Sequence, residues 1–467
     1  MKIIGRKSEI EQIRKLYDSG KSEFVVVYGR RRVGKTFLVN QFFDNKFLFK
    51  VTGLAVKDKA AQLVNFGEAL KKQGSPLCPY PKSWMEAFGF LKTLIESSKV
   101  KGRKVVFIDE LPFMYTNRCD LIVAIEHFWN DWGCTQDDLM LIVCGSATSW
   151  ITKKILRNKG GLHNRVTGKI YLRPFNLAEC KVYFRSVGIS LDEKDIAECY
   201  MIMGGIPYYL SLFEKGKSLA QNVDDLFFKR KGKLDGEFDN LYASLFENSE
   251  DYMKVIEALS RRNAGLTRKE VIAATGLPDG GGLSTILSDL DDCDIIRKYK
   301  AFGKKENDAV YQLTDFYTIF YYKFIRKYGT SDKPFWSYQI GTTLHIAWAG
   351  IAFERLCMCH HIQIEKALGI QGIMTETSAW RSENAQIDMV ISRADRVIDL
   401  CEIKFWEGPF SITKRYRQEL DNKINSFRDS LKLRRTLHLV FITTYGLKPN
   451  EYSGVVQNEV TLNNLFE

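Results

Sequence analysis

The stretch Gly29-Arg30-Arg31-Arg32-Val33-Gly34-Lys35-Thr36 determines how the chain can fold. It fits the pattern G-x-x-x-x-G-K-[ST], which forms a phosphate-binding loop when a strand precedes it and a helix follows. The apolar run Phe24–Tyr28 predicts that strand, and the apolar positions from Phe37 onward predict the helix. In such a loop Gly29 and Gly34 let backbone N–H groups turn toward phosphate, Lys35 reaches the β- and γ-phosphates, and Thr36 binds Mg²⁺. The sequence therefore predicts a site for ATP and Mg²⁺.

Two further apolar strands supply the rest of such a site. Lys104–Glu110 ends in two carboxylates, of which Asp109 is expected to hold the Mg²⁺ shell and Glu110 to polarise the attacking water. Leu139–Cys144 leads into a hydroxyl-rich turn, where Ser146, or as a second choice Thr148, is placed to sense the γ-phosphate. Strands separated by helices predict a parallel α/β core.

Arg165 is a candidate arginine finger, the residue that stabilises charge on the transferred phosphate. A solvated surface arginine is an equally good interpretation of that position.

Length, charge and cysteine content restrict the class of protein to which the chain can belong. A chain of 467 residues is too long for one core, and a formal net charge of +12 favours a polyanionic partner. The sequence has no apolar N-terminal signal core and no run long enough to span a membrane. Its ten scattered cysteines suit a reducing cytoplasm, and for Cys357-Met358-Cys359-His360-His361 buried thiols are favoured over a zinc site.

The middle of the chain is predicted to be helical and then to form a winged helix-turn-helix. Gly204-Gly205-Ile206-Pro207 breaks one helix and starts another, as in a helical lid. Three helices are predicted at Tyr252–Arg261, Arg268–Ala274 and Leu283–Leu290. A basic wing hairpin follows, which predicts phosphate contacts through Lys298, Lys300, Lys304 and Lys305. The third helix ends in acidic residues, so a protein-contact role for this module stays open: Asp289, Asp291 and Asp292.

Two strands near the C-terminus, Gln386–Arg393 and Val397–Phe405, are predicted to form a hairpin. If residues 394–396 form its loop, Asp388 lies directly opposite Glu402, about 5 Å away. Glu402 and Lys404 are two residues apart and share one face of their strand. Two carboxylates and a lysine at one sheet end predict a Mg²⁺ site with a charge stabiliser beside it.

Residues 1 to about 325 resemble the archaeal-type P-loop ATPases related to the AAA+ and STAND classes. The resemblance rests on Gly5-Arg6, the Gly29–Thr36 loop, Val105–Glu110, Cys144-Gly145-Ser146, Arg165 and Gly204-Gly205-Ile206-Pro207. It implies ATP-dependent switching, with Gly5 and Arg6 beside the adenine and Pro207 among the residues that contact the nucleotide.

The C-terminal segment resembles the PD-(D/E)XK nuclease-like domains that are often fused to those ATPases. Asp388 and Glu402-Ile403-Lys404 occupy the metal-binding motif, and Glu354 matches an acidic residue on the preceding helix. Ile387-Asp388 stands where Pro-Asp is usual. The resemblance implies a restriction-endonuclease-like α/β fold, Mg²⁺ held by Glu354, Asp388 and Glu402, catalysis by Lys404, and DNA as the partner.

We therefore expect a cytoplasmic ATPase that controls a Mg²⁺-dependent nuclease-like domain. The expected parts are a P-loop ATPase core over 1–175, a helical lid over 176–245, a winged helix-turn-helix over 246–325 and a nuclease-like domain over 326–467. Three alternatives remain: a DNA-binding regulator with an inert nuclease fold, a STAND-like switch with a protein ligand, and a remodelling ATPase that forms a ring.

Overall fold

The computed structural model describes residues 2–116, 119–246, 249–300, 302–303, 309–382, 385–431 and 435–467. The chain divides into two compact units. The first comprises Met1–Arg173, Ala243–Glu247 and Ser288–Cys293, and the second comprises Pro174–Tyr242, Asn248–Leu287 and Asp294–Glu467. The finer division into four parts stays a prediction.

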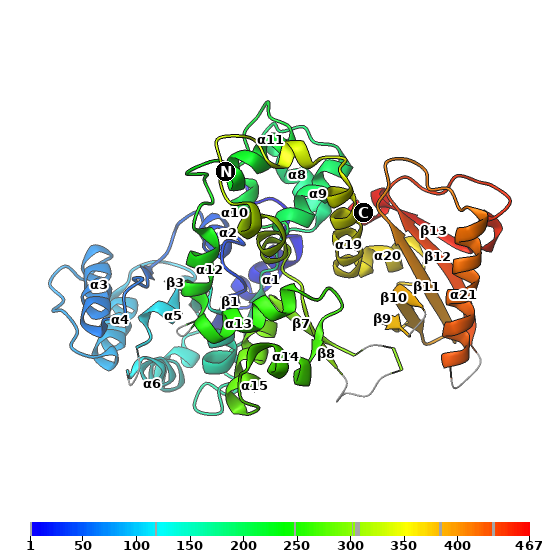
Figure 1. Cartoon of the computed structure of the whole chain (residues 1–467). Helices are drawn as coiled ribbons and strands as arrows, with labels where there is room; N and C mark the ends of the chain where they lie inside the picture. The colour runs from blue at the N-terminus through cyan, green and yellow to red at the C-terminus, as the bar shows by residue number, and fades with distance from the viewer. Residues whose placement is uncertain are drawn as a thin grey trace. The chain divides into compact units, whose positions relative to one another are not determined.

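A parallel sheet forms the centre of the first unit, with the strand order β2-β3-β4-β1-β5 within the described residues (Figure 1). The strands predicted from the three apolar runs are β1, β3 and β4, and every residue of β4 is buried, as expected of a strand covered on both faces. The parallel pairing confirms the α/β core. The strands are β1 (Glu23–Tyr28), β2 (Phe49–Thr52), β3 (Lys104–Asp109), β4 (Leu139–Gly145) and β5 (Gly168–Tyr171).

Helices cover this sheet through apolar faces. In α4, Phe88, Leu91 and Ile95 recur at helical spacing and are buried in the core beside the strands. Ser83 caps that helix by accepting a hydrogen bond from the Glu86 N–H. The helices are α1 (Lys7–Tyr17), α2 (Lys35–Phe42), α3 (Lys59–Lys72), α4 (Trp84–Ser97), α5 (Leu111–Met114), α6 (Leu121–His127) and α7 (Thr148–Ile151), with short turns η1 (Phe128–Trp132), η2 (Gly133–Thr135) and η3 (Thr152–Leu156).

The second unit begins with helices, as the sequence predicts. Gly204 and Gly205 have φ angles of 72° and 63°, and a Cβ on Gly205 would lie 2.3 Å from the Phe175 carbonyl oxygen. Pro207 starts the next helix, which confirms the predicted break and restart. The helices are α8 (Leu177–Ser186), α9 (Glu193–Met203), α10 (Pro207–Leu210), α11 (Leu219–Val223), η4 (Asp224–Phe228) and α12 (Glu237–Leu245), the last of which ends in the first unit.

Three helices and a small antiparallel sheet follow, at the places where the sequence predicts helices and a hairpin. Thr267 caps the second of these helices in a capping box with Glu270. The sheet has the strand order β6-β8-β7, whereas Lys304 and Lys305 of the expected wing lie outside the described residues. The elements are α13 (Ser249–Ser260), β6 (Leu266–Thr267), α14 (Arg268–Thr275), α15 (Gly281–Asp292), β7 (Ile296–Tyr299) and β8 (Val310–Leu313).

The acidic end of α15 has basic partners within the chain. Asp289 and Asp292 belong to the first unit, where they form ion pairs with Lys153 and Arg157. The acidity of this helix therefore does not by itself indicate a separate protein ligand.

A mixed sheet completes the second unit, with the strand order β13-β12-β11-β10-β9. The register pairs Met389 with Cys401 and Ser392 with Ile398, so three residues, 394–396, form the hairpin loop as predicted. The elements are α16 (Phe316–Phe320), η6 (Tyr321–Ile325), α17 (Arg326–Tyr328), α18 (Trp336–Gln339), α19 (Thr343–Cys359), α20 (His361–Ala367), β9 (Thr375–Arg381), β10 (Gln386–Arg393), β11 (Val397–Lys404), α21 (Lys414–Ser430), β12 (Thr436–Thr443), η7 (Ser453–Val455), β13 (Asn458–Thr461) and η8 (Leu462–Phe466).

The long helix α21 runs along one face of this sheet (Figure 1). Phe427 on the helix packs edge-to-face against Trp380 of β9, with ring centroids 5.2 Å apart, in a cluster that includes Val390 and Leu400. This packing fixes which side chains of α21 reach the end of β11. Among the helices of the described residues, none combines the length and the apolar character needed to cross a lipid bilayer.

Candidate functional site

Strand β1, the loop and helix α2 follow each other without a gap, as the motif predicts. Gly29 has φ 139°, and a Cβ there would lie 2.2 Å from the Leu172 carbonyl oxygen. Gly34 has φ 91° and precedes the first residue of α2. Both positions require glycine, so the loop has the backbone that turns N–H groups toward an anion at the N-terminus of a helix.

The side chains expected to hold phosphate and Mg²⁺ lie together. Lys35 is 4% exposed, and its ammonium donates to the carbonyl oxygens of Gly29 and Arg30, at 3.0 and 2.9 Å. The Thr36 hydroxyl donates to both carboxylate oxygens of Asp109, at 3.1 and 2.9 Å. Because β1 and β3 are parallel strands of one sheet, their carboxyl ends bring Thr36 and Asp109 to the same edge.

These residues fit Mg²⁺ by their chemistry. Burial raises the pKa of Asp109, the neighbouring Glu110 raises it further, and a divalent cation would favour the ionised form. Within the described part of the chain no three His, Cys, Asp or Glu side chains group closely enough to hold a metal ion. Mg²⁺ bound with nucleotide does not need such a group, because phosphates and waters supply its remaining oxygen ligands.

Glu110 is held by the third strand of the site. Its carboxylate accepts hydrogen bonds from the Ser146 N–H at 3.0 Å and from the Ser146 hydroxyl at 2.8 Å. The order of the sheet explains this contact, since β4 lies between β1 and β3. The Thr148 hydroxyl is buried and has no hydrogen-bond partner among the described residues. The geometry therefore favours Ser146, the first choice from sequence, over Thr148.

The remaining nucleotide-site predictions have different outcomes. Arg6 has φ 58°, is 5% exposed and donates to the Val33 carbonyl oxygen at 3.1 Å, so it contacts the phosphate-binding loop directly. Gly5 precedes it with φ 63°. The Arg165 side chain is exposed and makes no ion pair with the residues that the structure describes. Pro207 belongs to the second unit, and its contact with nucleotide stays a prediction.

The second unit contains a separate group of charged side chains at the end of the C-terminal sheet. The hairpin register continues from Met389 and Cys401 to place Asp388 beside Glu402, and an Asp388 carboxylate oxygen accepts from the Ile403 N–H at 3.2 Å. A β-bulge interrupts the pairing of β10 with β9 between Ile387 and Val390. Bulges redirect side chains and are frequent beside active sites.

Helix α21 contributes two residues that sequence reasoning missed. Glu402 is buried and accepts hydrogen bonds from Lys404 at 2.8 Å and from the Tyr416 hydroxyl at 2.5 Å. The Lys423 ammonium lies 2.9 and 2.8 Å from its two carboxylate oxygens. Tyr416 and Lys423 are seven residues apart, on the helix face that also carries buried Leu420 and Phe427. That spacing was the available signal for their position.

The pKa values of the three carboxylates at this site shift in different directions. Burial and the neighbouring Asp388 raise the pKa of Glu354 to about 8. Burial and Glu402 raise the pKa of Asp388 as well. Burial alone would raise the pKa of Glu402, but Lys404 and Lys423 outweigh it, so that pKa is lowered. Two ammonium groups thus compensate the charge of Glu402. Among the described residues no three His, Cys, Asp or Glu side chains are grouped closely enough to hold a metal ion, so the structure does not gather Glu354, Asp388 and Glu402 into the three-carboxylate Mg²⁺ site expected from the sequence.

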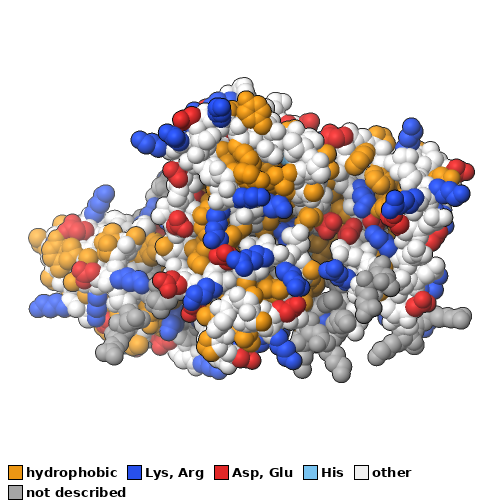
Figure 2. All heavy atoms as spheres, in the orientation of Figure 1, with side chains coloured by type: hydrophobic (Ala, Val, Ile, Leu, Met, Phe, Trp, Pro, Cys, Tyr) orange, Lys and Arg blue, Asp and Glu red, His pale blue; other side chains and the backbone are white. Residues whose placement is uncertain are grey.

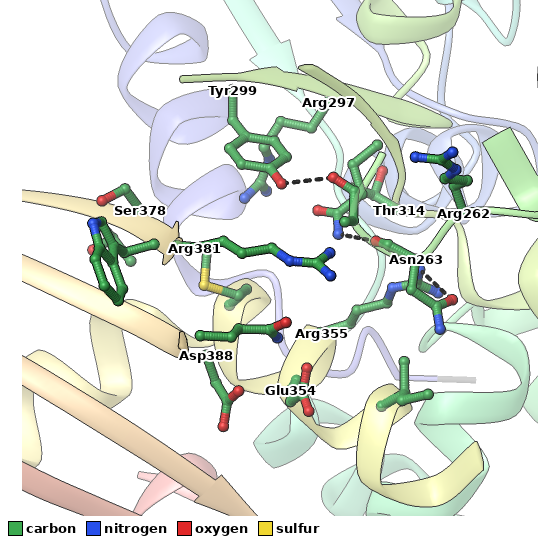
Figure 3. Close-up of a pocket in the computed structure, with 18 of the residues that line it drawn as sticks. Arg262, Asn263, Arg297, Tyr299, Thr314, Glu354, Arg355, Ser378, Arg381 and Asp388 are labelled. Atoms are coloured by element: carbon green, nitrogen blue, oxygen red, sulfur yellow. Dashed lines mark hydrogen bonds between the residues drawn. The ribbon is translucent and has the colours of Figure 1, made fainter. Parts of the chain in front are cut away.

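A pocket of about 520 Å³ within the second unit opens onto Glu354 and Asp388. Figure 3 shows Glu354 and Asp388 side by side on one wall, with the Arg381 side chain extending across the pocket. Arg355 projects from α19 and donates to the Asn263 carbonyl and amide oxygens, at 3.4 and 3.3 Å. The lining also contains Arg261, Arg262 and Arg297, so the approach to the carboxylates is strongly basic.

The parallel sheet, the phosphate-binding loop and the paired Thr36 and Asp109 define a P-loop ATPase core. Residues 3–213 match the family model of the ATPase domain predominantly from Archaea. The chain thus carries an archaeal-type ATPase domain.

Two relatives of known sequence match this chain over very different lengths. An uncharacterized protein of Methanocaldococcus jannaschii is 25% identical over 408 residues, which cover 86% of this chain and 87% of that protein. An uncharacterized ATP-binding protein of the same organism is 42% identical over 43 residues, or 9% of this chain and 73% of that protein.

Among solved structures, a Walker-type ATPase of Pyrococcus abyssi is 18% identical. The match covers 68% of this chain and 95% of that one, with a TM-score of 0.49. A STAND protein with a tetratricopeptide repeat sensor from Pyrococcus horikoshii is 17% identical over 78% of this chain and 55% of that one, with a TM-score of 0.31.

Proposed function

We propose that this protein is an ATP-dependent switch whose ATPase domain controls a Mg²⁺-dependent, nuclease-like site in the second unit that acts on DNA. The observation that carries the proposal is that Glu354 and Asp388 line one basic pocket at a β-bulge, with the Glu402–Lys404 ion pair as their electrostatic neighbour.

The residues of this site have separable roles in the proposal. Glu354 and Asp388 would hold Mg²⁺ through carboxylate oxygens, and the ion would polarise the phosphodiester and stabilise charge as the bond breaks. Lys404 is fixed by Glu402 beside them, where its ammonium would orient water or stabilise developing negative charge. The raised pKa values of Glu354 and Asp388 fit a site in which a cation favours their ionised forms.

In the ATPase site, Lys35 would bind the β- and γ-phosphates and Glu110 would orient the attacking water. Ser146 holds Glu110 and would report on the γ-phosphate. We propose that Arg165 reaches the nucleotide of a neighbouring copy, which requires an oligomer. The helices α13–α15 and the β7–β8 hairpin would act as a winged helix whose Lys298 and Lys300 contact phosphates.

The test is cleavage of single- and double-stranded DNA by the full-length protein with Mg²⁺, in the presence and absence of ATP. We expect wild type to cleave, Asp388→Asn to lose cleavage and Mg²⁺ binding, and Lys404→Ala to lose cleavage while it retains Mg²⁺. Lys35→Ala should change the dependence on ATP and leave the nuclease-like site intact. Cleavage that persists in both Asp388→Asn and Lys404→Ala would exclude this site as its source.

One observation favours a second candidate, a DNA-binding regulator with an inert nuclease fold. Lys404 and Lys423 both bind Glu402, so two cations already satisfy a carboxylate that the sequence motif assigns to the metal. DNA binding by wild type without cleavage under any Mg²⁺ or ATP condition would support this candidate over the nuclease.

A further inference from the structure

Two cavities of the second unit adjoin each other and share part of their lining. The pocket that opens onto Glu354 and Asp388 has a volume of about 520 Å³, and a second cavity has a volume of about 500 Å³. Arg261, Asn263, Ile351 and Arg355 line both cavities. Together the two cavities form a channel that reaches from α13 and η6, past Arg355, to Glu354 and Asp388.

Cations line the whole length of this channel. The outer cavity carries Lys323, Arg326 and Lys327, and the inner pocket carries Arg262, Arg297 and Arg381. Figure 2 shows Lys and Arg side chains gathered on the viewed face over the region of α13 and β7. This distribution is typical of a surface that follows a chain of phosphates.

Not all of these cations are neutralised by neighbouring acids. Arg261 and Arg326 share Glu257, with contacts of 2.9 and 3.1 Å, and Arg262 lies 3.5 Å from Glu270. Arg297 and Arg381 are exposed and form no ion pair with any residue that the structure describes. Figure 3 shows Arg381 extending into the space that a ligand would occupy. The pocket therefore retains positive charge for an incoming anion.

We propose that this channel binds one strand of nucleic acid through its phosphodiester backbone and presents that strand to Glu354 and Asp388. For the chemistry at Glu354 and Asp388 the inference rests on the proposed function, but the binding itself does not require cleavage. Arg297 and Arg381 contact the phosphates nearest Glu354 and Asp388. Arg355 lies where the two cavities meet.

The size of the inner pocket favours a single strand as the ligand. A pocket of about 520 Å³ lies in the range that encloses small molecules, and only one or two nucleotides of a strand fit there at a time. A duplex would place two backbones and paired bases at the same opening. Tyr299 on the wall is held by a hydrogen bond from its hydroxyl to the Ala264 carbonyl oxygen at 2.9 Å, so its ring offers a fixed surface on which a base can stack.

The test is equilibrium binding by the full-length protein in EDTA without nucleotide, so that neither cleavage nor the ATP site contributes. The probes are a labelled oligothymidylate of about 15 nucleotides, its RNA equivalent, a duplex of the same length, and thymidine monophosphate as a competitor. We expect Arg297→Ala/Arg381→Ala to weaken single-strand binding by about tenfold or more. The slope of log K against log salt should fall by about 1.4, roughly 0.7 for each lost phosphate contact.

Arg185→Ala is the matched control. Arg185 is an exposed arginine of α8 in the same unit, lines neither cavity and has no ion pair among the described residues. It should leave both affinity and salt slope unchanged. Arg381→Lys retains the charge and should recover most of the binding.

Three results would overturn the inference. The first is a duplex that binds as tightly as the single strand, with the same dependence on the two arginines. The second is a monophosphate that competes as well as the oligonucleotide. The third is an equal loss of affinity in Arg185→Ala and in the double variant. Arginine-dependent single-strand binding without any Mg²⁺-dependent cleavage would instead refute the nuclease function and leave the binding inference standing. Comparison of the DNA and RNA probes then shows which strand the channel prefers.

Discussion

The Lys423 ammonium lies 2.9 Å from one carboxylate oxygen of Glu402 and 2.8 Å from the other. Lys423 comes from helix α21 and Glu402 from strand β11, so the contact joins the helix to the C-terminal end of that strand. A divalent cation on Glu402 would have to share this carboxylate with Lys423. Lys423 would thus oppose a metal on Glu402, and its ion pair stabilises the metal-free protein.

Replacement of Lys423 by methionine should therefore have two opposite effects. Without metal the variant should be less stable by about 3 kcal/mol, because a buried carboxylate loses one of its two cations. Added Mg²⁺ should raise the melting temperature of Lys423→Met more than that of wild type. The measurement is thermal unfolding of nucleotide-free protein with and without Mg²⁺.

Lys414→Met provides the control for Lys423→Met, because Lys414 is an exposed lysine at the start of the same helix. It should behave like wild type in both conditions. An identical Mg²⁺ response in all three proteins would show that Glu402 takes no part in metal binding.

In the nucleotide site, Lys35→Ala should weaken ATP binding by about tenfold or more, since a charged hydrogen bond to phosphate is lost. Glu110→Gln should retain ATP binding and slow hydrolysis by roughly 10²–10⁴-fold, because water is no longer polarised. Nucleotide titration and phosphate release distinguish the two effects. Arg31→Ala, within the same loop, should leave binding largely intact, and a loss as large as that in Lys35→Ala would mean that the loop binds phosphate through its arginines.

The contact between Ser146 and Glu110 predicts that Ser146→Ala slows hydrolysis by about tenfold with little change in ATP affinity, because Glu110 loses a hydrogen bond that positions it. Thr148→Val is the matched control. It conserves volume at a buried hydroxyl that has no partner among the described residues. Equal rates in Ser146→Ala and wild type would show that the backbone N–H alone positions Glu110.

His360 predicts a pH dependence of stability. Burial lowers its pKa from 6.5 to about 4, and the neutral ring donates from Nδ1 to the Leu356 carbonyl oxygen and accepts at Nε2 from the Leu177 N–H. The unfolded chain binds this proton more readily, so the stabilisation is complete above pH 6.5 and is lost as the pH falls toward 4. The loss should approach roughly 3 kcal/mol, since one pKa unit corresponds to about 1.4 kcal/mol.

His360→Gln removes the titrating group and isolates this contribution. The difference in unfolding free energy between wild type and the variant should decrease as the pH falls from 6.5 to 4, as measured by denaturant titration at each pH. Parallel pH curves for the two proteins would contradict the buried neutral state of His360.

Local features of the sequence were sufficient for much of the fold. The phosphate-binding loop was predictable because glycine spacing, a preceding strand and a following helix lie within one short stretch, Phe24–Phe43. The pairing of Asp388 with Glu402 was predictable because a three-residue loop determines the register of a hairpin, and Met389 faces Cys401 as that loop requires. Backbone geometry decides both features within a few residues.

Only the tertiary structure showed which groups neutralise each site and what surrounds it. Lys423 reaches Glu402 because Phe427 and Leu420 bury one face of α21 against the sheet, a contact between residues far apart in sequence. The contact of Ser146 with Glu110 depends on the order of strands in the sheet, and the channel depends on Arg297, Arg355 and Arg381 from three separate elements. Sequence patterns specify which face of an element is apolar, whereas the burial of one face against another decides which charges meet.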